Sequence, residues 1–165
     1  MSLADSILME MDQESHTTKR VLDRVPESKL SWKPHPKSRS LGQLALHVAA
    51  SPAGVASLAS MDTAEAPAFP EPQPADCREI LETFSNSLAD AKKTVGKMDD
   101  ARLHSTWTLT KNGETIMAMP RIAFLRSVLL NHVYHHRGQL SVYLRLLDVP
   151  VPSIYGPSAD ENPFV

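Results

Sequence analysis

Apolar residues recur at spacings of three and four in four long segments of the chain, and this is the spacing of one face of an α-helix. The first segment covers about residues 2–25, and Pro26 ends it because the residue before a proline is disfavoured in helical geometry. The other segments cover about residues 40–61, 76–98 and 120–147. Amphipathic helices bury their apolar faces against one another, so the pattern predicts an all-α four-helix bundle.

Local signals refine the second segment and the connection that follows it. Ser40 followed by Gln43 is typical of a capping box, in which a hydroxyl and an amide satisfy the first backbone groups of a helix. Pro52 lies inside this segment, one turn after His47, and should kink the helix because proline removes a backbone hydrogen bond. Four prolines between residues 62 and 75 indicate a stiff loop.

A short β-hairpin is predicted before the last helix. Two β-favouring runs between Thr106 and Ala118 flank Asn112-Gly113, which is a strong signal for a tight hairpin turn. A two-stranded ribbon is marginally stable alone, so we expect it to pack on the bundle, with Trp107 as a packing anchor.

Length, charge and cysteine content limit the remaining classes of protein. The chain has 165 residues, which fits a single domain over residues 1–165. The net charge is −2 with both signs mixed, so no basic field would attract nucleic acid. Cys77 is the only cysteine, which excludes an internal disulfide; it is either a thiol activated by a helix start or, as we expect, a small packed residue. Without a basic leader or a long apolar run, we expect a cytoplasmic protein that does not enter membranes.

Three histidines lie on predicted apolar helix faces. His132 and His136 are four residues apart, so their Cβ atoms would lie about 6 Å apart on one face of the last helix. His47 lies on the inward face of the second helix. Three imidazoles can bind a divalent ion and leave positions open, as catalytic metal sites do; the alternative is three core histidines bonded to backbone or carboxylate groups. His135 lies at the edge of the face, where we expect it at the surface or supporting a ligand.

Other residues near this constellation allow two interpretations each. Arg137 could bind an anionic substrate, but we favour a salt bridge or an interface contact on the flank of the helix. Glu14 is a general base or supports a ligand, or it simply reaches solvent from an apolar face, which we favour. Gln139 either orients a ligand histidine or packs between helices. Tyr155 and Asp160 either close a pocket or form a turn with a capping carboxylate, the interpretation that we favour.

Three stretches of the chain together resemble one known family. They are WKPHPKSRSLGQLALHVAA (Trp32–Ala50), NHVYHHRGQLSVYLR (Asn131–Arg145) and VPSIYGPSADE (Val151–Glu161). With the helix layout between them, they resemble the DinB superfamily of DinB/YfiT-like metalloenzymes over essentially the whole chain.

The resemblance carries expectations about fold and function. It implies an up-down-down-up helix order, a homodimer, and a divalent ion, commonly nickel or zinc, on the positions of His47, His132 and His136. Characterised members include S-transferases and isomerases that use low-molecular-weight thiols. We therefore expect a metal-dependent thiol S-transferase or hydrolase acting on a small molecule. The alternative is a non-catalytic metal- or ligand-binding module or a stress-linked interaction protein, because no catalytic acid or base can be identified in the sequence.

Overall fold

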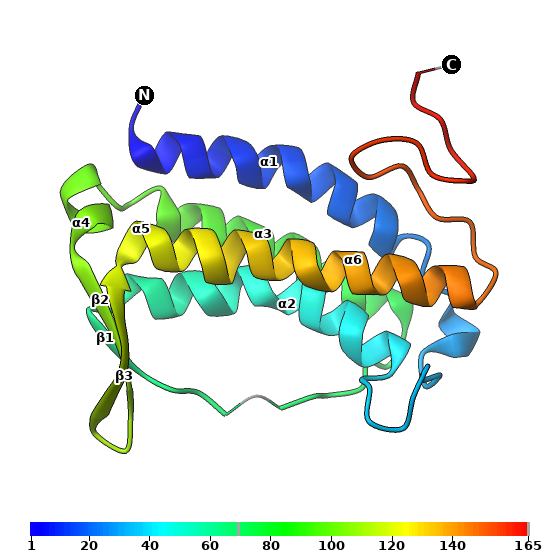
Figure 1. The fold of residues 1–165 in the computed structure, drawn as a ribbon, viewed down its shortest axis with the longest axis horizontal. Helices are drawn as coiled ribbons and strands as arrows, with labels where there is room; N and C mark the ends of the chain where they lie inside the picture. The colour runs from blue at the N-terminus through cyan, green and yellow to red at the C-terminus, as the bar shows by residue number, and fades with distance from the viewer. Residues whose placement is uncertain (69, 165) are drawn as a thin grey trace.

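Four long helices dominate the computed structural model, which describes residues 1–68 and 70–164 (Figure 1). They are α1 (Leu3–Leu22), α2 (Leu41–Ser60), α3 (Cys77–Val95) and a last helix that joins α5 (Arg121–Phe124), a π-helical segment (Leu125–Leu130) and α6 (Asn131–Leu146). α1 and α2 each pack against both α3 and α6, so each long helix buries a face against two neighbours. The up-down-down-up order of the helices stays a prediction.

The helix starts follow the capping signals of the sequence. Ser40 Oγ accepts a hydrogen bond from the Gln43 backbone N–H at 3.1 Å, and Gln43 Oε1 accepts one from the Ser40 backbone N–H at 2.9 Å. This confirms the predicted capping box of α2. Ser2 and Asp5 form the same reciprocal pair at the start of α1. The remaining helical elements are a 3-10 turn, η1 (Glu27–Lys29), and the short helix α4 (Asp100–His104).

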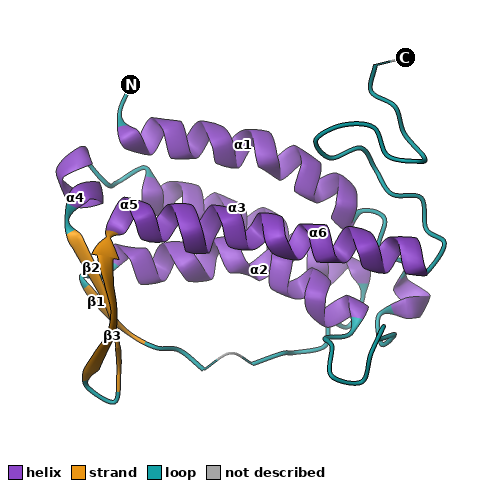
Figure 2. Cartoon of the chain, in the orientation of Figure 1, coloured by secondary structure: helices purple, strands orange, loops and turns teal. Residues whose placement is uncertain are grey.

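A small three-stranded sheet lies at one end of the helices (Figure 2), which corrects the all-α prediction to a mostly helical fold with a sheet. Its strands are β1 (Thr63–Glu65), β2 (Thr106–Lys111) and β3 (Glu114–Pro120). β2 and β3 are the predicted hairpin, and Asn112 and Gly113 have the positive φ angles of 53° and 81° that a tight hairpin turn requires.

Strand β1 falls in the segment that was predicted to be a loop. It pairs in parallel with β2, with Thr63 opposite Thr108, and the Ala66 N–H donates to the Thr110 carbonyl at 2.7 Å. Three residues are too few to show an alternating pattern, and their partner strand is more than 40 residues away in the sequence. The strand therefore exists through tertiary pairing, which no local signal reveals.

Trp107 fixes the sheet to the helices, as expected. Its ring is fully buried and stacks on Phe124 with ring centroids 3.7 Å apart. Its indole N–H donates to the Leu58 carbonyl of α2 at 3.0 Å, so the polar atom is satisfied inside the core. This contact joins β2 to both α2 and the last helix.

Pro52 interrupts the backbone hydrogen bonds of α2, and α3 supplies a replacement. Figure 1 shows α2 changing direction along its length, in agreement with the predicted kink. The N–H of Ala53 donates to Ser87 Oγ of α3 at 2.8 Å, and Ser87 Oγ donates to the Ala50 carbonyl at 3.1 Å. One buried hydroxyl thus satisfies a donor and an acceptor beside the proline.

Replacing Ser87 with alanine should lower the free energy of unfolding by about 1–3 kcal/mol, because the partly buried Ala53 N–H and Ala50 carbonyl would both lose their partner. Urea unfolding monitored by circular dichroism would measure the change. Ser85→Ala, at an exposed position of the same helix, is the matched control and should be close to neutral. Equal effects of the two substitutions would show that Ser87 has no special role at the kink.

Helix α2 is the most apolar helix of the fold. By length and composition it could cross a membrane, contrary to the expectation that no segment would qualify, but 61% of its most apolar stretch is buried inside the fold. The core helix of a bundle meets the same criteria, so α2 is weak evidence for a membrane span. The cytoplasmic location stays a prediction that fractionation can test.

Candidate metal centre

The structure brings His47, His132 and His136 together. Nε2 of His132 lies 3.3 Å from Nε2 of His47 and 3.0 Å from Nε2 of His136. One ring nitrogen from each residue can be chosen so that all three lie within 4.8 Å of one another. The rings are nearly perpendicular in each pair, with centroids 4.4–5.0 Å apart. Three imidazole nitrogens therefore converge on one point between α2 and α6.

The π-helical segment determines where the two histidines of α6 point. A π turn adds one residue to a helical turn, so the buried face after it shifts by one position. Val133, Arg137 and Leu140 are buried in α6, whereas His132 and His136 are half-buried at the edge of that face. The two histidines were predicted to face the core, and they lie half-buried at the edge of the buried face instead of within it, where they converge with His47 as expected.

A hydrogen bond at Nδ1, the ring nitrogen that points away from the cluster, orients the His136 ring. Nδ1 of His136 donates to Gln139 Oε1 at 2.7 Å, which leaves the lone pair of His136 Nε2 facing the other two histidines. Of the two interpretations of Gln139, the structure thus supports the orienting one. Nδ1 of His132 is buried and has no hydrogen-bond partner among the described residues.

The three imidazoles are held in their neutral form. Burial is the main cause that lowers the pKa of His47 to about 3 and that of His132 to about 4, and it also lowers the pKa of His136. The nearby Arg39 guanidinium lowers all three pKa values further. Neutral imidazole is the form that binds metal ions.

These residues fit a divalent metal ion. Ligand nitrogens at 2.0–2.1 Å from a tetrahedral ion lie roughly 3.3 Å apart, close to the two nitrogen–nitrogen distances around His132. Because His136 carries its proton on Nδ1, its Nε2 has a lone pair that faces His132 Nε2. His132 Nε2 carries at most one proton, so it can donate a hydrogen bond to only one of its two histidine neighbours. A cation at the meeting point would satisfy all three nitrogens together.

The depressed pKa values give the metal-free protein a defined pH dependence. In the unfolded chain these histidines take up protons near pH 6.5, whereas His47 and His132 in the fold resist protonation down to about pH 3 and 4. The unfolded state therefore binds more protons in this window, and the free energy of unfolding should fall as the pH is lowered from about 6.5 to 4.

Urea unfolding of metal-free protein at several pH values would measure this fall. A His132→Leu/His136→Leu variant should show a shallower dependence, since one lowered pKa remains at His47. Identical slopes in wild type and variant would contradict a buried, neutral cluster.

His135 does not join the three converging histidines. It is exposed, and its ring lies edge-on to the His136 ring with centroids 4.9 Å apart. This agrees with the expected position at the surface beside a candidate ligand.

Glu14 and Arg137 form an ion pair on the buried face of α6, the face whose edge carries His132 and His136. Arg137 is 1% exposed, which corrects its predicted position on the flank, and its Nη1 lies 2.7 Å from Glu14 Oε2. Arg137 also donates to Thr18 Oγ1 at 3.1 Å and to the Tyr155 hydroxyl at 2.5 Å. The Tyr155 hydroxyl in turn donates to Glu14 Oε2 at 2.9 Å. The favoured salt-bridge interpretation of Arg137 is confirmed, and Glu14 reaches this arginine instead of solvent.

The favoured interpretations of Asp160 and Cys77 also agree with the structure. Asp160 accepts a hydrogen bond from the Val151 backbone N–H at 2.8 Å and pairs with Arg145, so it stabilises a turn of the C-terminal segment. Burial raises the pKa of the Cys77 thiol, which donates to the Val25 carbonyl at 3.3 Å. Cys77 is a packed residue and not an activated thiol.

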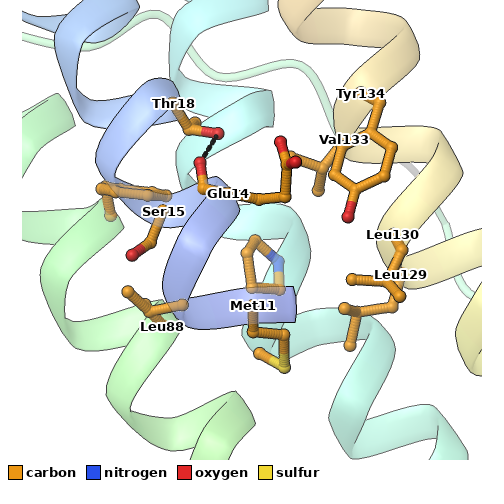
Figure 3. A pocket seen from close by; sticks show the side chains of 11 residues that line it. Met11, Glu14, Ser15, Thr18, Leu88, Leu129, Leu130, Val133 and Tyr134 are labelled. Carbon is orange, nitrogen blue, oxygen red and sulfur yellow. Dashed lines mark hydrogen bonds between the residues drawn. The ribbon is translucent and has the colours of Figure 1, made fainter. Parts of the chain in front are cut away.

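Two of the cavities that border α2 lie near the residues discussed above, and one of these two is lined by a candidate ligand. The first has a volume of about 30 Å³, and Figure 3 shows Met11 and Glu14 of α1 facing Leu129 and Tyr134 of the last helix across it. Its lining is mainly apolar and contains no histidine. The second has a volume of about 190 Å³ and is lined in part by His47.

Sequence reasoning did not find two residues of the second cavity, Arg39 and Glu71. Arg39 Nε donates to Glu71 Oε1 at 2.8 Å, and both side chains line the cavity beside His47. Arg39 directly precedes the Ser40 cap and Glu71 lies among prolines, so neither belongs to a periodic pattern. Their proximity depends on how the proline-rich connection returns across α2.

Comparisons with known proteins agree with this fold. A sequence profile of the DinB family matches residues 1–162. The uncharacterized protein YrdA of Bacillus subtilis (strain 168) is 27% identical over 162 residues, which cover 95% of this chain and 90% of that protein.

Two solved structures are similar in fold. A DinB-like protein from Bacillus cereus ATCC 10987 has a TM-score of 0.70 at 22% identity and covers 92% of this chain and 97% of its own. The DinB-like protein YjoA of Bacillus subtilis has a TM-score of 0.70 at 17% identity and covers 90% of this chain and 97% of its own. With the family profile matched from residue 1 to residue 162, the chain belongs to the DinB family.

Proposed function

We propose that His47, His132 and His136 bind a divalent metal ion, nickel or zinc, and that the protein is a metal-dependent thiol S-transferase or hydrolase acting on a small molecule. The convergence of three imidazole nitrogens within 4.8 Å carries this proposal. Imidazole ligands suit nickel and zinc, and three protein ligands leave room for a further one.

The residues of the chain would prepare this site in two ways. Burial keeps the histidines neutral, and Gln139 holds the proton of His136 on Nδ1, so that Nε2 is available as a ligand. A bound divalent ion lowers the pKa of a water or thiol towards about 7 and so supplies a nucleophile at neutral pH.

A non-catalytic binding module is the second candidate function. Glu14 was the carboxylate considered as a general base. In the structure it pairs with Arg137 and accepts a hydrogen bond from Tyr155, and none of its hydrogen bonds to described residues involves the three histidines. A ligand-binding or stress-linked interaction role would need no acid or base at the centre.

An activity screen of metal-loaded protein separates the two functions. Wild type loaded with nickel or zinc would be tested for thiol conjugation to small electrophiles and for ester or amide hydrolysis, with a His47→Leu variant taken through the same metal treatment as control. Turnover by wild type alone supports the enzyme. Tight metal binding without turnover in either assay supports the binding module.

We also propose that the protein forms a homodimer. Val142 and Leu146 of α6 are 57% and 58% exposed, and burying such apolar side chains between two copies would stabilise a dimer. Light scattering at micromolar concentration should therefore give twice the chain mass of 18.2 kDa. A mass of one chain at that concentration would contradict the proposal.

A further inference from the structure

The cavity of about 190 Å³ beside His47 has a charged wall. The start of α2 contributes Arg39, Gln43 and His47, and the proline-rich connection contributes Glu71 with its flanking prolines. The cavity thus places a guanidinium group beside a candidate metal ligand, a combination that the histidine cluster alone does not provide.

The connection is fastened over the start of α2 by contacts that do not involve the Arg39 side chain. Gln43 Nε2 donates to the Glu71 carbonyl at 2.8 Å. Ser40 Oγ donates to Gln73 Oε1 at 2.7 Å, and Gln73 Nε2 donates to the Leu30 carbonyl at 3.0 Å. The wall of the cavity therefore has support other than the Arg39–Glu71 ion pair.

The guanidinium group of Arg39 makes only part of the hydrogen bonds that it can make. Its Nε donates to Glu71 Oε1, and neither terminal nitrogen makes a hydrogen bond to any of the described residues. The Arg39 side chain is 25% exposed and the Glu71 side chain 47%, so the pair is reachable from solvent. A guanidinium group can bind a carboxylate through two parallel hydrogen bonds, of which this pair makes one.

The electrostatic environment of the histidines favours an anion. Arg39 and His47 line the same cavity, so the guanidinium charge lies close to a candidate metal ligand. A divalent ion would add to this positive potential. Within the cavity, Glu71 is the one acidic side chain, and it already pairs with Arg39.

We propose that this cavity is the substrate pocket and that Arg39 binds a carboxylate of an anionic small molecule, which takes the place of Glu71. The inference rests on the proposed metal site and narrows its substrate class to compounds with a metal-binding group, such as a thiol, at one end and a carboxylate at the other. Arg39 is then the residue that selects charge, and Glu71 is an internal competitor for it.

The test compares two probes on nickel-loaded protein, 3-mercaptopropionate and the neutral 2-mercaptoethanol. Their dissociation constants would be measured by calorimetry and by the absorption that a thiolate gives on nickel. Arg39→Gln should weaken 3-mercaptopropionate about tenfold, because a charge-assisted pair is lost. The same variant should leave 2-mercaptoethanol nearly unchanged.

Two further variants separate recognition from loop stability. Lys37→Gln removes the same charge two residues away from Arg39, outside the cavity lining. It should leave the dissociation constants of both probes nearly unchanged, because salt screens the interaction of a distant exposed charge. Glu71→Gln should strengthen 3-mercaptopropionate binding, because Arg39 loses its competitor. If the ion pair only held the loop in place, Arg39→Gln and Glu71→Gln would change the affinity in the same direction, and the inference would be overturned.

The outcomes also distinguish this inference from the proposed function. If nickel does not bind, or binds without accepting 2-mercaptoethanol, the open metal site itself is refuted and the pocket assignment falls with it. If 2-mercaptoethanol binds and Arg39→Gln leaves 3-mercaptopropionate unchanged, the metal site stands and the role of Arg39 is refuted.

Discussion

Replacing both His132 and His136 with leucine should leave the metal-free protein as stable as metal-free wild type, or more stable. The two imidazoles are half-buried, and His132 Nδ1 has no hydrogen-bond partner among the described residues, so their removal deletes polar groups that the fold satisfies poorly. Leucine adds apolar area whose burial contributes ~25 cal/mol per Å². Thermal and urea unfolding in a chelating buffer would measure the comparison.

Added nickel or zinc should then raise the melting temperature of wild type and not that of the double variant. A ligand that binds only the folded state at 100 times its dissociation constant stabilises by about 2.7 kcal/mol, which is several degrees for a domain of this size. His135→Leu is the matched control and should keep the full response, since His135 does not join the cluster. Loss of the response in His135→Leu with retention in His136→Leu would show that the ligand assignment is wrong.

Replacing Glu14 with leucine should lower the free energy of unfolding by about 3–5 kcal/mol, because it leaves the charge of Arg137 buried without its partner. Arg137 is 1% exposed, so water cannot take over the role of the carboxylate. The same substitution removes the acceptor of the Tyr155 hydroxyl, which loosens the C-terminal segment. Urea unfolding would measure the loss.

Two controls test the cause of this loss. The double variant Glu14→Leu/Arg137→Met replaces the ion pair by apolar side chains and should recover much of the stability. Lys19→Met removes one partner of the exposed Lys19–Asp23 pair and should cost far less, since exposed pairs contribute ~0–1 kcal/mol. A double variant less stable than Glu14→Leu would show that Arg137 stabilises the fold without Glu14.

The long helices and the hairpin could be predicted because their signals are local. The capping pair Ser40 and Gln43 marks the start of α2, and Asn112-Gly113 marks the hairpin turn, each within four residues of sequence. Strand β1 could not be predicted, because its three residues form a strand only through pairing with β2. Local patterns carry no information about such long-range pairing.

The candidate site was predictable in its members but not in its surroundings. Helical spacing placed His132 and His136 on one face, and their meeting with His47 followed once the helices were packed. The π-helical segment before Asn131 shifted the buried face by one residue, so that Arg137 became buried and the histidines moved to its edge. No periodicity in the sequence announces that extra residue.

Equilibrium dialysis against nickel or zinc, followed by elemental analysis, tests the central claim most directly. Wild type at about pH 7.5 should retain one ion per chain, and His47→Leu, His132→Leu and His136→Leu should each retain far less, while His135→Leu should match wild type. Wild type without a bound ion, or single variants that retain as much metal as wild type, would contradict a metal centre on these three histidines.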